Sequence, residues 1–61
     1  MSQYQMGIFV MDFLQNLGID MITIGKAICD EHLERSYWLI KENPEITKEK
    51  FLTAMQIKEE Q

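Results

Sequence analysis

Apolar residues recur with helical spacing over residues 3–17, but they cover too much of that helix for burial on one side. At 100° per residue they span roughly 220°, about twice the arc of a helix that packs on a single neighbour. They are Tyr4, Met6, Phe9, Val10, Met11, Phe13, Leu14 and Leu17, and Ile8 lies outside even this arc. A helix this apolar normally lies between two layers, so the pattern predicts that a second copy of the chain covers it.

A second pattern, from residue 21 to about residue 42, predicts a longer amphipathic helix with one core-facing stripe. Its apolar and small residues share an arc of roughly 140°, and charged side chains fill the rest. The stripe consists of Met21, Ile22, Gly25, Ile28, Cys29, His32, Leu33, Ser36, Leu39 and Ile40. Gly25 is expected where this helix approaches a neighbour closely, because a glycine inside a helix costs ~1 kcal/mol relative to alanine.

Capping residues define the ends of the predicted helices. Ser2 begins a capping box at the start of the first helix. Gly18 takes the left-handed position that ends this helix, and Asp20 caps the second helix. Pro44 ends the second helix, since a proline pushes the residue before it out of the helical region. Thr47 then caps a third helix.

These signals predict an all-α fold in a single small helical domain, residues 1–61. A helical hairpin of residues 3–17 and 21–42 is followed by a short third helix, residues 48–58. A chain of this size buries only ~60% of the surface that its unfolded state exposes. We therefore expect it to assemble as a homo-oligomeric helical bundle, because one copy has little core of its own.

A β-strand at the N-terminus is the main alternative to this fold. Tyr4, Met6, Ile8 and Val10 alternate with other residues, which is the period of a strand. A strand followed by two helices would be the arrangement of ribbon-helix-helix DNA-binding dimers. The helix after it would be short, however, and the polar strand face has no basic residues to support it.

Charge and cysteine content narrow the classes of function. Ten acidic residues against six basic ones give a net charge of −4, without a lysine or arginine cluster. The chain therefore lacks the basic patch typical of contact with nucleic acid or anionic lipid. The first apolar segment is interrupted by Asp12, so it predicts neither a signal peptide nor a membrane span. Cys29 is the one cysteine, which excludes an intrachain disulfide and favours a reducing cytoplasm.

Few residues could carry chemistry. Cys29 and His32 have a spacing that can supply two metal ligands, but two ligands per chain are too few for a zinc site. Ser36 lies one turn after His32 without a carboxylate to orient the pair. We therefore expect no enzyme activity, no catalytic residue, no metal, no cofactor and no small-molecule ligand.

Trp38 breaks the pattern, because it falls in the middle of the charged arc of the second predicted helix. One interpretation is that the third helix turns back and covers it with Phe51, Leu52 or Met55. The other is that Trp38 anchors a partner protein, since tryptophan is enriched at interaction hot spots. Its predicted acidic rim, which favours a basic partner surface, consists of Glu31, Glu34 and Glu42.

Together, the sequence predicts a non-enzymatic protein–protein interaction module, a small cytoplasmic regulator or inhibitor that acts as a homo-oligomer. The predicted self-association residues are Tyr4, Met6, Phe9, Val10, Phe13, Leu14 and Leu17. A small DNA-binding regulator of the helix-turn-helix or ribbon-helix-helix type is the alternative. Its third helix would present Lys48, Lys50 and Lys58, which neighbouring glutamates offset.

Overall fold

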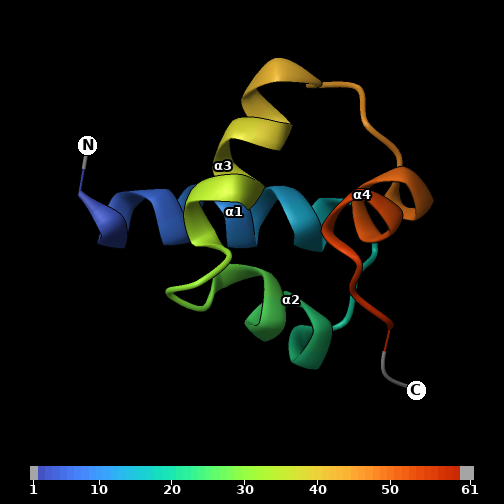
Figure 1. The fold of residues 1–61 in the computed structure, drawn as a ribbon, viewed down its shortest axis with the longest axis horizontal. Helices are drawn as coiled ribbons and strands as arrows, with labels where there is room; N and C mark the ends of the chain where they lie inside the picture. The colour runs from blue at the N-terminus through green and yellow to red at the C-terminus, as the bar shows by residue number, and fades with distance from the viewer. Residues whose placement is uncertain (1, 60–61) are drawn as a thin grey trace.

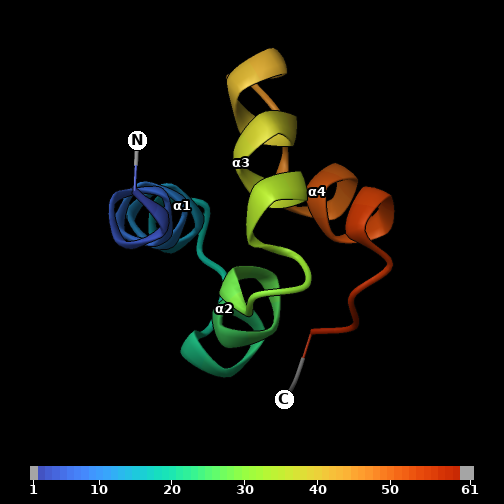
Figure 2. The ribbon, with the colours of Figure 1, turned by 60° about the vertical axis from the view of Figure 1, so that its left-hand side comes forward.

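The computed structural model describes residues 2–59, which fold into four helices without a strand. The helices are α1 (Gln3–Asn16), α2 (Met21–Ile28), α3 (Leu33–Glu42) and α4 (Lys48–Met55). Helix α1 packs against both α2 and α3, and α4 packs against the other side of α3 (Figures 1 and 2). The all-α prediction is confirmed for these residues, and the strand alternative is wrong because α1 occupies its place.

Helix α1 begins and ends where its capping residues predicted. The Ser2 hydroxyl accepts a hydrogen bond from the Gln5 amide at 3.2 Å, and the Ser2 amide donates to the Gln5 side chain at 3.3 Å. At the other end Gly18 has a φ of 83°, and the Ile19 amide donates to the Leu14 carbonyl at 3.1 Å. Only glycine takes such a positive φ without strain, so Gly18 lets the chain turn sharply into α2.

Asp20 caps α2, also as predicted. Its carboxylate accepts from the Thr23 amide at 3.1 Å and from the Thr23 hydroxyl at 2.6 Å. The side-chain hydrogen bond from Thr23 is the largest influence on this carboxyl group and lowers its pKa, while partial desolvation opposes the shift. The carboxylate satisfies an amide that α2 itself leaves without a partner.

The prediction of one long helix over residues 21–42 is wrong, because the chain breaks between α2 and α3. Cys29 is extended, with a ψ of 160°, and the α-helix resumes at Leu33. Side chains satisfy carbonyls at the end of α2: the Ser36 hydroxyl donates to the Ala27 carbonyl at 2.9 Å. Such side-chain bonds compete with continuing the helix, and the break lets both helices pack on α1.

The break also changes which face of α2 is buried. Thr23, Ile24 and Ala27 face the core, whereas Met21 and Ile22, predicted as buried, are exposed. On α3 the predicted residues Leu33, Ser36 and Ile40 are buried, together with Tyr37, which the pattern placed outside the stripe. A constant 100° per residue cannot hold across a break, so the two halves could not both be in phase.

Each helix contributes fully buried side chains to one core: Val10, Leu14, Ile24, Ile40 and Phe51. Helix α4 ends at Met55, three residues before the predicted position 58. Gln56 takes the left-handed conformation there, with a φ of 58°, and the Ile57 amide donates to the Leu52 carbonyl at 3.0 Å. The segment after α4 is tied back by an ion pair between Lys48 and Glu59 at 2.9 Å.

Candidate functional site

The surface predicted for self-association on α1 lies mostly inside the single chain. Val10 and Leu14 are fully buried, so they cannot contact a second copy, whereas Tyr4 is 77% exposed. The remaining predicted residues are half-buried against the core: Met6, Phe9, Phe13 and Leu17. Because the break turns one predicted helix into two, both layers that cover α1 come from its own chain.

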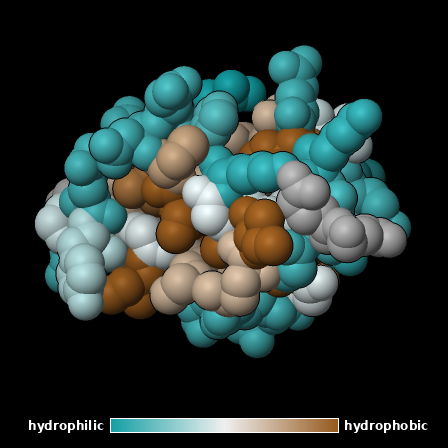
Figure 3. Space-filling view, turned by 90° about the horizontal axis from the view of Figure 1, so that it is seen from below, coloured by the Kyte–Doolittle hydropathy of each residue, from teal (hydrophilic) through white to brown (hydrophobic). Residues whose placement is uncertain are grey.

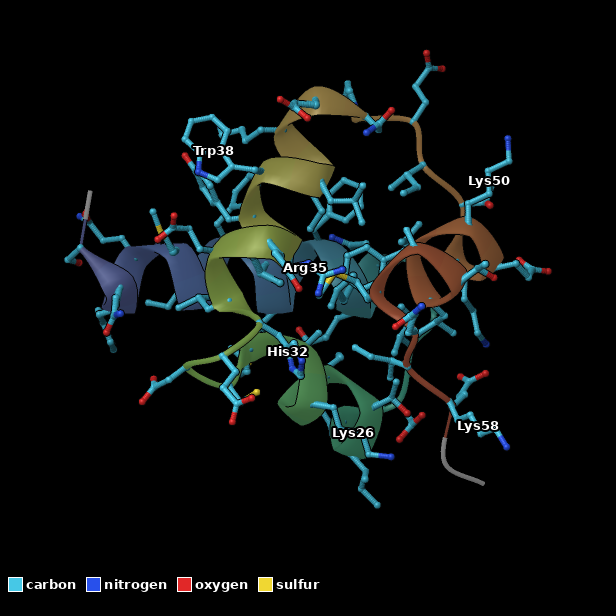
Figure 4. The ribbon with its side chains drawn as sticks, in the orientation of Figure 1. Lys26, His32, Arg35, Trp38, Lys50 and Lys58 are labelled. Carbon is cyan, nitrogen blue, oxygen red and sulfur yellow. The ribbon has the colours of Figure 1, made fainter. Side chains whose placement is uncertain are left out.

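Trp38 lies on α3 and is 52% exposed (Figure 4). Its ring meets that of Tyr37 edge-on, with 5.3 Å between the ring centroids. The interpretation that α4 covers Trp38 is wrong, because the ring stays half exposed while Phe51 lies in the core and Met55 reaches only the groove beside it. An exposed tryptophan held by a neighbouring ring is a rigid apolar surface that another protein can contact.

A groove between α3 and α4 runs beside Trp38. Its lining residues are Glu34, Arg35, Trp38, Leu39, Glu42, Ala54 and Met55. On α3, Glu34, Trp38 and Glu42 follow one another at intervals of four residues, so they form one row on the helix surface. The structure thus brings together three of the four predicted partner-binding residues. Glu31 does not line the groove, since it lies in the break before α3 begins.

The two cations of α3 make contacts within the chain. Arg35 extends toward α4, and its Nη2 donates to the Ala54 carbonyl at 3.4 Å (Figure 4). The Nζ of Lys41 lies 5.0 Å from the ring centroid of Phe9, on α1. Neither Glu34 nor Glu42 forms an ion pair within residues 2–59. Their carboxylates therefore give the groove beside Trp38 an acidic rim.

The outward face of α2 is a second candidate surface, which sequence reasoning missed. Met21 is 58% exposed and Ile22 is 67% exposed, and Gly25 and Cys29 continue the same row. Figure 3 shows apolar side chains gathered across the middle of the underside of the molecule, where α2 lies. Because the inner face of α2 is also apolar, this helix has two apolar faces, as was predicted for a first helix lying between two layers.

No close neighbour explains why residue 25 is a glycine, contrary to the prediction that Gly25 faces the core. It is exposed, and beyond its chain neighbours and its own helix backbone a Cβ there would meet no atom of residues 2–59 within 4 Å. It lines a groove between α2 and the segment after α4, formed by Ile22, Gly25, Lys26, Cys29, His32, Gln56, Ile57 and Lys58. The ~1 kcal/mol that a helical glycine costs relative to alanine is therefore unexplained by this chain alone.

The candidate chemical residues cluster at the corner between α2 and α3. The Cys29 Sγ lies 3.1 Å from the His32 Nδ1, and both lie near the Lys26 carbonyl, at 3.3 and 3.1 Å. The Ser36 hydroxyl is fully buried and donates a hydrogen bond to the Ala27 carbonyl. Across the described residues, no three histidine, cysteine or acidic side chains come together as metal ligands would. These contacts support the corner structurally.

None of the four helices within residues 2–59 is long and apolar enough to cross a membrane. Comparison with protein-family models, curated proteins and solved structures found no match to this chain. The Trp38 groove and the outward face of α2 are therefore the two candidate functional surfaces.

Proposed function

We propose that this protein is a non-enzymatic interaction module that binds a basic amphipathic segment of a partner protein in the Trp38 groove. One observation carries the proposal: Trp38 is half exposed between two unpaired carboxylates, while the cations of the same helix are engaged within the chain. A module of this kind acts as a small regulator or inhibitor by occupying the partner's basic segment.

The groove offers apolar contacts at its floor and carboxylates at its rim, which match the apolar and basic residues of such a segment. Leu39 and Met55 supply apolar side chains, and exposed Ala54 leaves space above α4 for an incoming side chain. Methionine adapts its shape to different neighbours, which suits a floor that receives an apolar anchor. Lysine or arginine residues flanking that anchor would meet Glu34 and Glu42 at the rim.

Burial and charge have different roles in this proposal. Removing a hot-spot tryptophan weakens binding by about 2 kcal/mol or more, which is about thirtyfold in Kd. Rim carboxylates mainly raise the association rate, and salt screens that effect. We therefore expect binding that depends strongly on Trp38 and that weakens as ionic strength rises.

The single tryptophan allows a direct test, because its fluorescence reports occupancy of the groove. The probe is a short amphipathic helical peptide of leucine and lysine, compared with a matched peptide of leucine and glutamate. We expect a blue shift with the basic peptide only, and weaker binding at high salt.

Variants identify the site. Glu34→Gln and Glu42→Gln should each weaken binding of the basic peptide several-fold, whereas Glu31→Gln, outside the groove, should not. Trp38→Ala, followed by calorimetry in place of fluorescence, should weaken it about thirtyfold or more. Equal binding of the acidic peptide, or an unchanged Kd for Trp38→Ala, would contradict the proposal.

The alternative of a DNA-binding regulator depends on exposed cations on and after α4. Of the lysines on and after α4, Lys48 is paired with Glu59. Coulomb attraction to Glu59 and their hydrogen bond raise the pKa of Lys48, with the hydrogen bond the larger influence. This cation is therefore engaged within the chain, and a DNA-binding role stays a prediction without structural support.

A further inference from the structure

We infer that the groove between α2 and the segment after α4 binds a small amphiphilic carboxylate, of the kind represented by a free medium-chain fatty acid. This groove, called the α2 groove below, is a different surface from the Trp38 groove. The inference therefore does not depend on the function proposed above. It gives the chain a small-molecule ligand, which was not expected from the sequence.

The sign of its charge distinguishes the α2 groove from the Trp38 groove. The chain has ten acidic and six basic residues, yet no acidic side chain of residues 2–59 lines the α2 groove. Lys26 of α2 and Lys58 of the segment after α4 line it instead, and both lie on the lower side of the molecule in Figure 4. A groove lined by one sign of charge attracts the opposite sign, so this groove selects an anion.

Lys58 is the side chain that we assign to the carboxylate. It is exposed and forms no ion pair within residues 2–59. Lys26 takes part in another interaction of the chain, so it contributes positive charge without being assigned the ion pair. The His32 Nδ1 lies 3.1 Å from both the Cys29 Sγ and the Lys26 carbonyl oxygen, and these contacts hold the ring at the edge of the groove.

The α2 groove also has an apolar wall on each side. Ile22 on α2 is 67% exposed, and Ile57 on the segment after α4 is half-buried. The Ile57 amide donates to the Leu52 carbonyl at 3.0 Å, which fixes the turn that carries this side chain. An alkyl chain lying between the two isoleucines would remove apolar surface from water on both sides, so the anion should carry an apolar body.

Gly25 leaves room for that alkyl chain. Glycine destabilises a helix relative to alanine, and no neighbour of Gly25 within residues 2–59 requires it. It does allow a ligand to approach the helix backbone closely, where a side chain would stand in the way. The groove has a volume of about 560 Å³, against about 320 Å³ for the Trp38 groove, and is within the range of small-molecule sites.

The size of the groove favours a small molecule over a protein. A standard interface buries ~800 Å² per partner, and the outward face of the eight-residue α2 is smaller than that. A second copy of the chain would also bring a net charge of −4 toward the first. A single-chain carboxylate needs only one cation and a short apolar wall, which the α2 groove supplies.

The first measurement uses Cys29, the one cysteine of the chain, as a reporter, because it lines the groove. Octanoate should slow alkylation of Cys29 by iodoacetamide in a saturable way. We expect a Kd on the order of 1 mM, since an open groove covers a small ligand on one side only. Octylamine, which has the same chain and the opposite charge, should not protect the thiol, and neither should acetate, which lacks the chain.

A series of carboxylates from butanoate to decanoate measures the apolar wall. Each added methylene should tighten binding about threefold while it is covered, and the Kd should level off once the chain extends beyond the groove. Nuclear magnetic resonance shifts on binding should gather at Ile22, Gly25 and Ile57, and the Trp38 indole should not respond. A Kd that falls without limit as the chain lengthens would indicate unspecific adsorption and contradict the inference.

Two variants test the groove itself. Lys58→Gln should weaken octanoate binding at least fivefold, whereas Lys50→Gln, which removes the same charge from an exposed site on α4, should leave it unchanged. Gly25→Leu should weaken binding at least tenfold by filling the groove. Its melting temperature should not fall, because leucine favours a helix and its Cβ has free space. Ile22→Gln, at an exposed site, gives a second test of the apolar wall should Gly25→Leu fail to fold.

Several results would overturn the inference. They are an absence of saturable protection, equal binding of octylamine, or an unchanged Kd for Lys58→Gln and Ile22→Gln. Binding to phosphatidylglycerol vesicles without binding of octanoate would overturn it in favour of a lipid surface. Trp38→Ala should leave octanoate binding unchanged, so failure of this inference and failure of the Trp38 groove proposal are separable.

Discussion

Helices α1 and α2 are both unusually apolar, but the chain covers most of α1 and leaves one apolar face of α2 exposed. Helix α1 has the wider apolar arc, and its own chain covers most of it from two sides. Helix α2 is shorter, and it keeps an inner row in the core while an outer row of Met21, Ile22, Gly25 and Cys29 faces outward. The apolar content of a helix therefore does not show which helix lacks cover, because that depends on how many layers the rest of the chain supplies.

The strongest test of this comparison sets a buried residue of α1 against an exposed residue of α2. Leu14→Ala should lower the free energy of unfolding by about 3 kcal/mol, since it leaves a cavity at a fully buried site. Ile22→Ala should change it by less than about 0.5 kcal/mol. Urea denaturation of dilute monomer measures both.

Similar losses for the two variants would mean that Ile22 is covered within the chain. The comparison between the helices would then fail. Val10→Ala, also fully buried on α1, serves as a second reference for the α1 side.

The second test concerns the corner that separates α2 from α3. Ser36→Ala removes the hydroxyl that donates to the Ala27 carbonyl at 2.9 Å in a fully buried position. We expect a loss of about 1–2 kcal/mol in the free energy of unfolding, because a buried carbonyl loses its side-chain donor. Thr53→Ala, which removes an exposed hydroxyl on α4, should cause no loss when measured in the same way.

A gain in stability for Ser36→Ala would show that the corner does not depend on this bond. The two halves would then be free to join into the single helix that the sequence predicted. Nuclear magnetic resonance chemical shifts of residues 29–32 would report such a change directly.

The sequence predicted the features that depend on bonds between near neighbours, and it missed the break between α2 and α3, which involves residues farther apart. Ser2, Gly18, Asp20 and Thr47 were placed correctly, because each cap depends on bonds within a few residues. The break was missed because the buried hydrogen bond at this corner joins Ser36 to a carbonyl nine residues away. A helical wheel contains no term for such a bond.

The candidate site shows the same division. Glu34, Trp38 and Glu42 were grouped correctly, because a spacing of four residues keeps them in one row within α3. Glu31 was grouped with them only on the assumption of a continuous helix, and it lies in the break. The outward face of α2 was missed for the same reason, because the continuous helix that was assumed over residues 21–42 placed these residues in the core.

A third effect, no larger than the second, concerns the two left-handed positions that end α1 and α4. Gly18→Ala should lower the free energy of unfolding by about 1–2 kcal/mol, because an L side chain is strained at a φ of 83°. Beyond its two chain neighbours, its Cβ would meet no atom of residues 2–59 within 4 Å, so the loss would report backbone strain alone. Gln56→Gly should raise it by roughly 0.5–1 kcal/mol, since relief of strain exceeds the added freedom of the unfolded chain.

Thermal unfolding of the two single variants and of the double variant measures these effects. The double variant should show the sum of the two single effects, because the substitutions act on different helix ends. If Gly18→Ala proves neutral, the sharp turn from α1 into α2 does not require glycine.

The smallest effect is the pH dependence of the cap that begins α2. The Thr23 hydrogen bonds lower the pKa of Asp20 below its ordinary value of about 3.9, so the folded state favours the ionised carboxylate. A lowered folded pKa means that this stabilisation is complete above the ordinary value. It is lost as the pH falls through the folded pKa. Melting temperatures of the native chain and Asp20→Asn, which keeps a capping oxygen but does not titrate, should therefore converge as the pH falls below 4. A constant difference between the two at every pH would show that the charge of Asp20 does not contribute to holding α2 against the core.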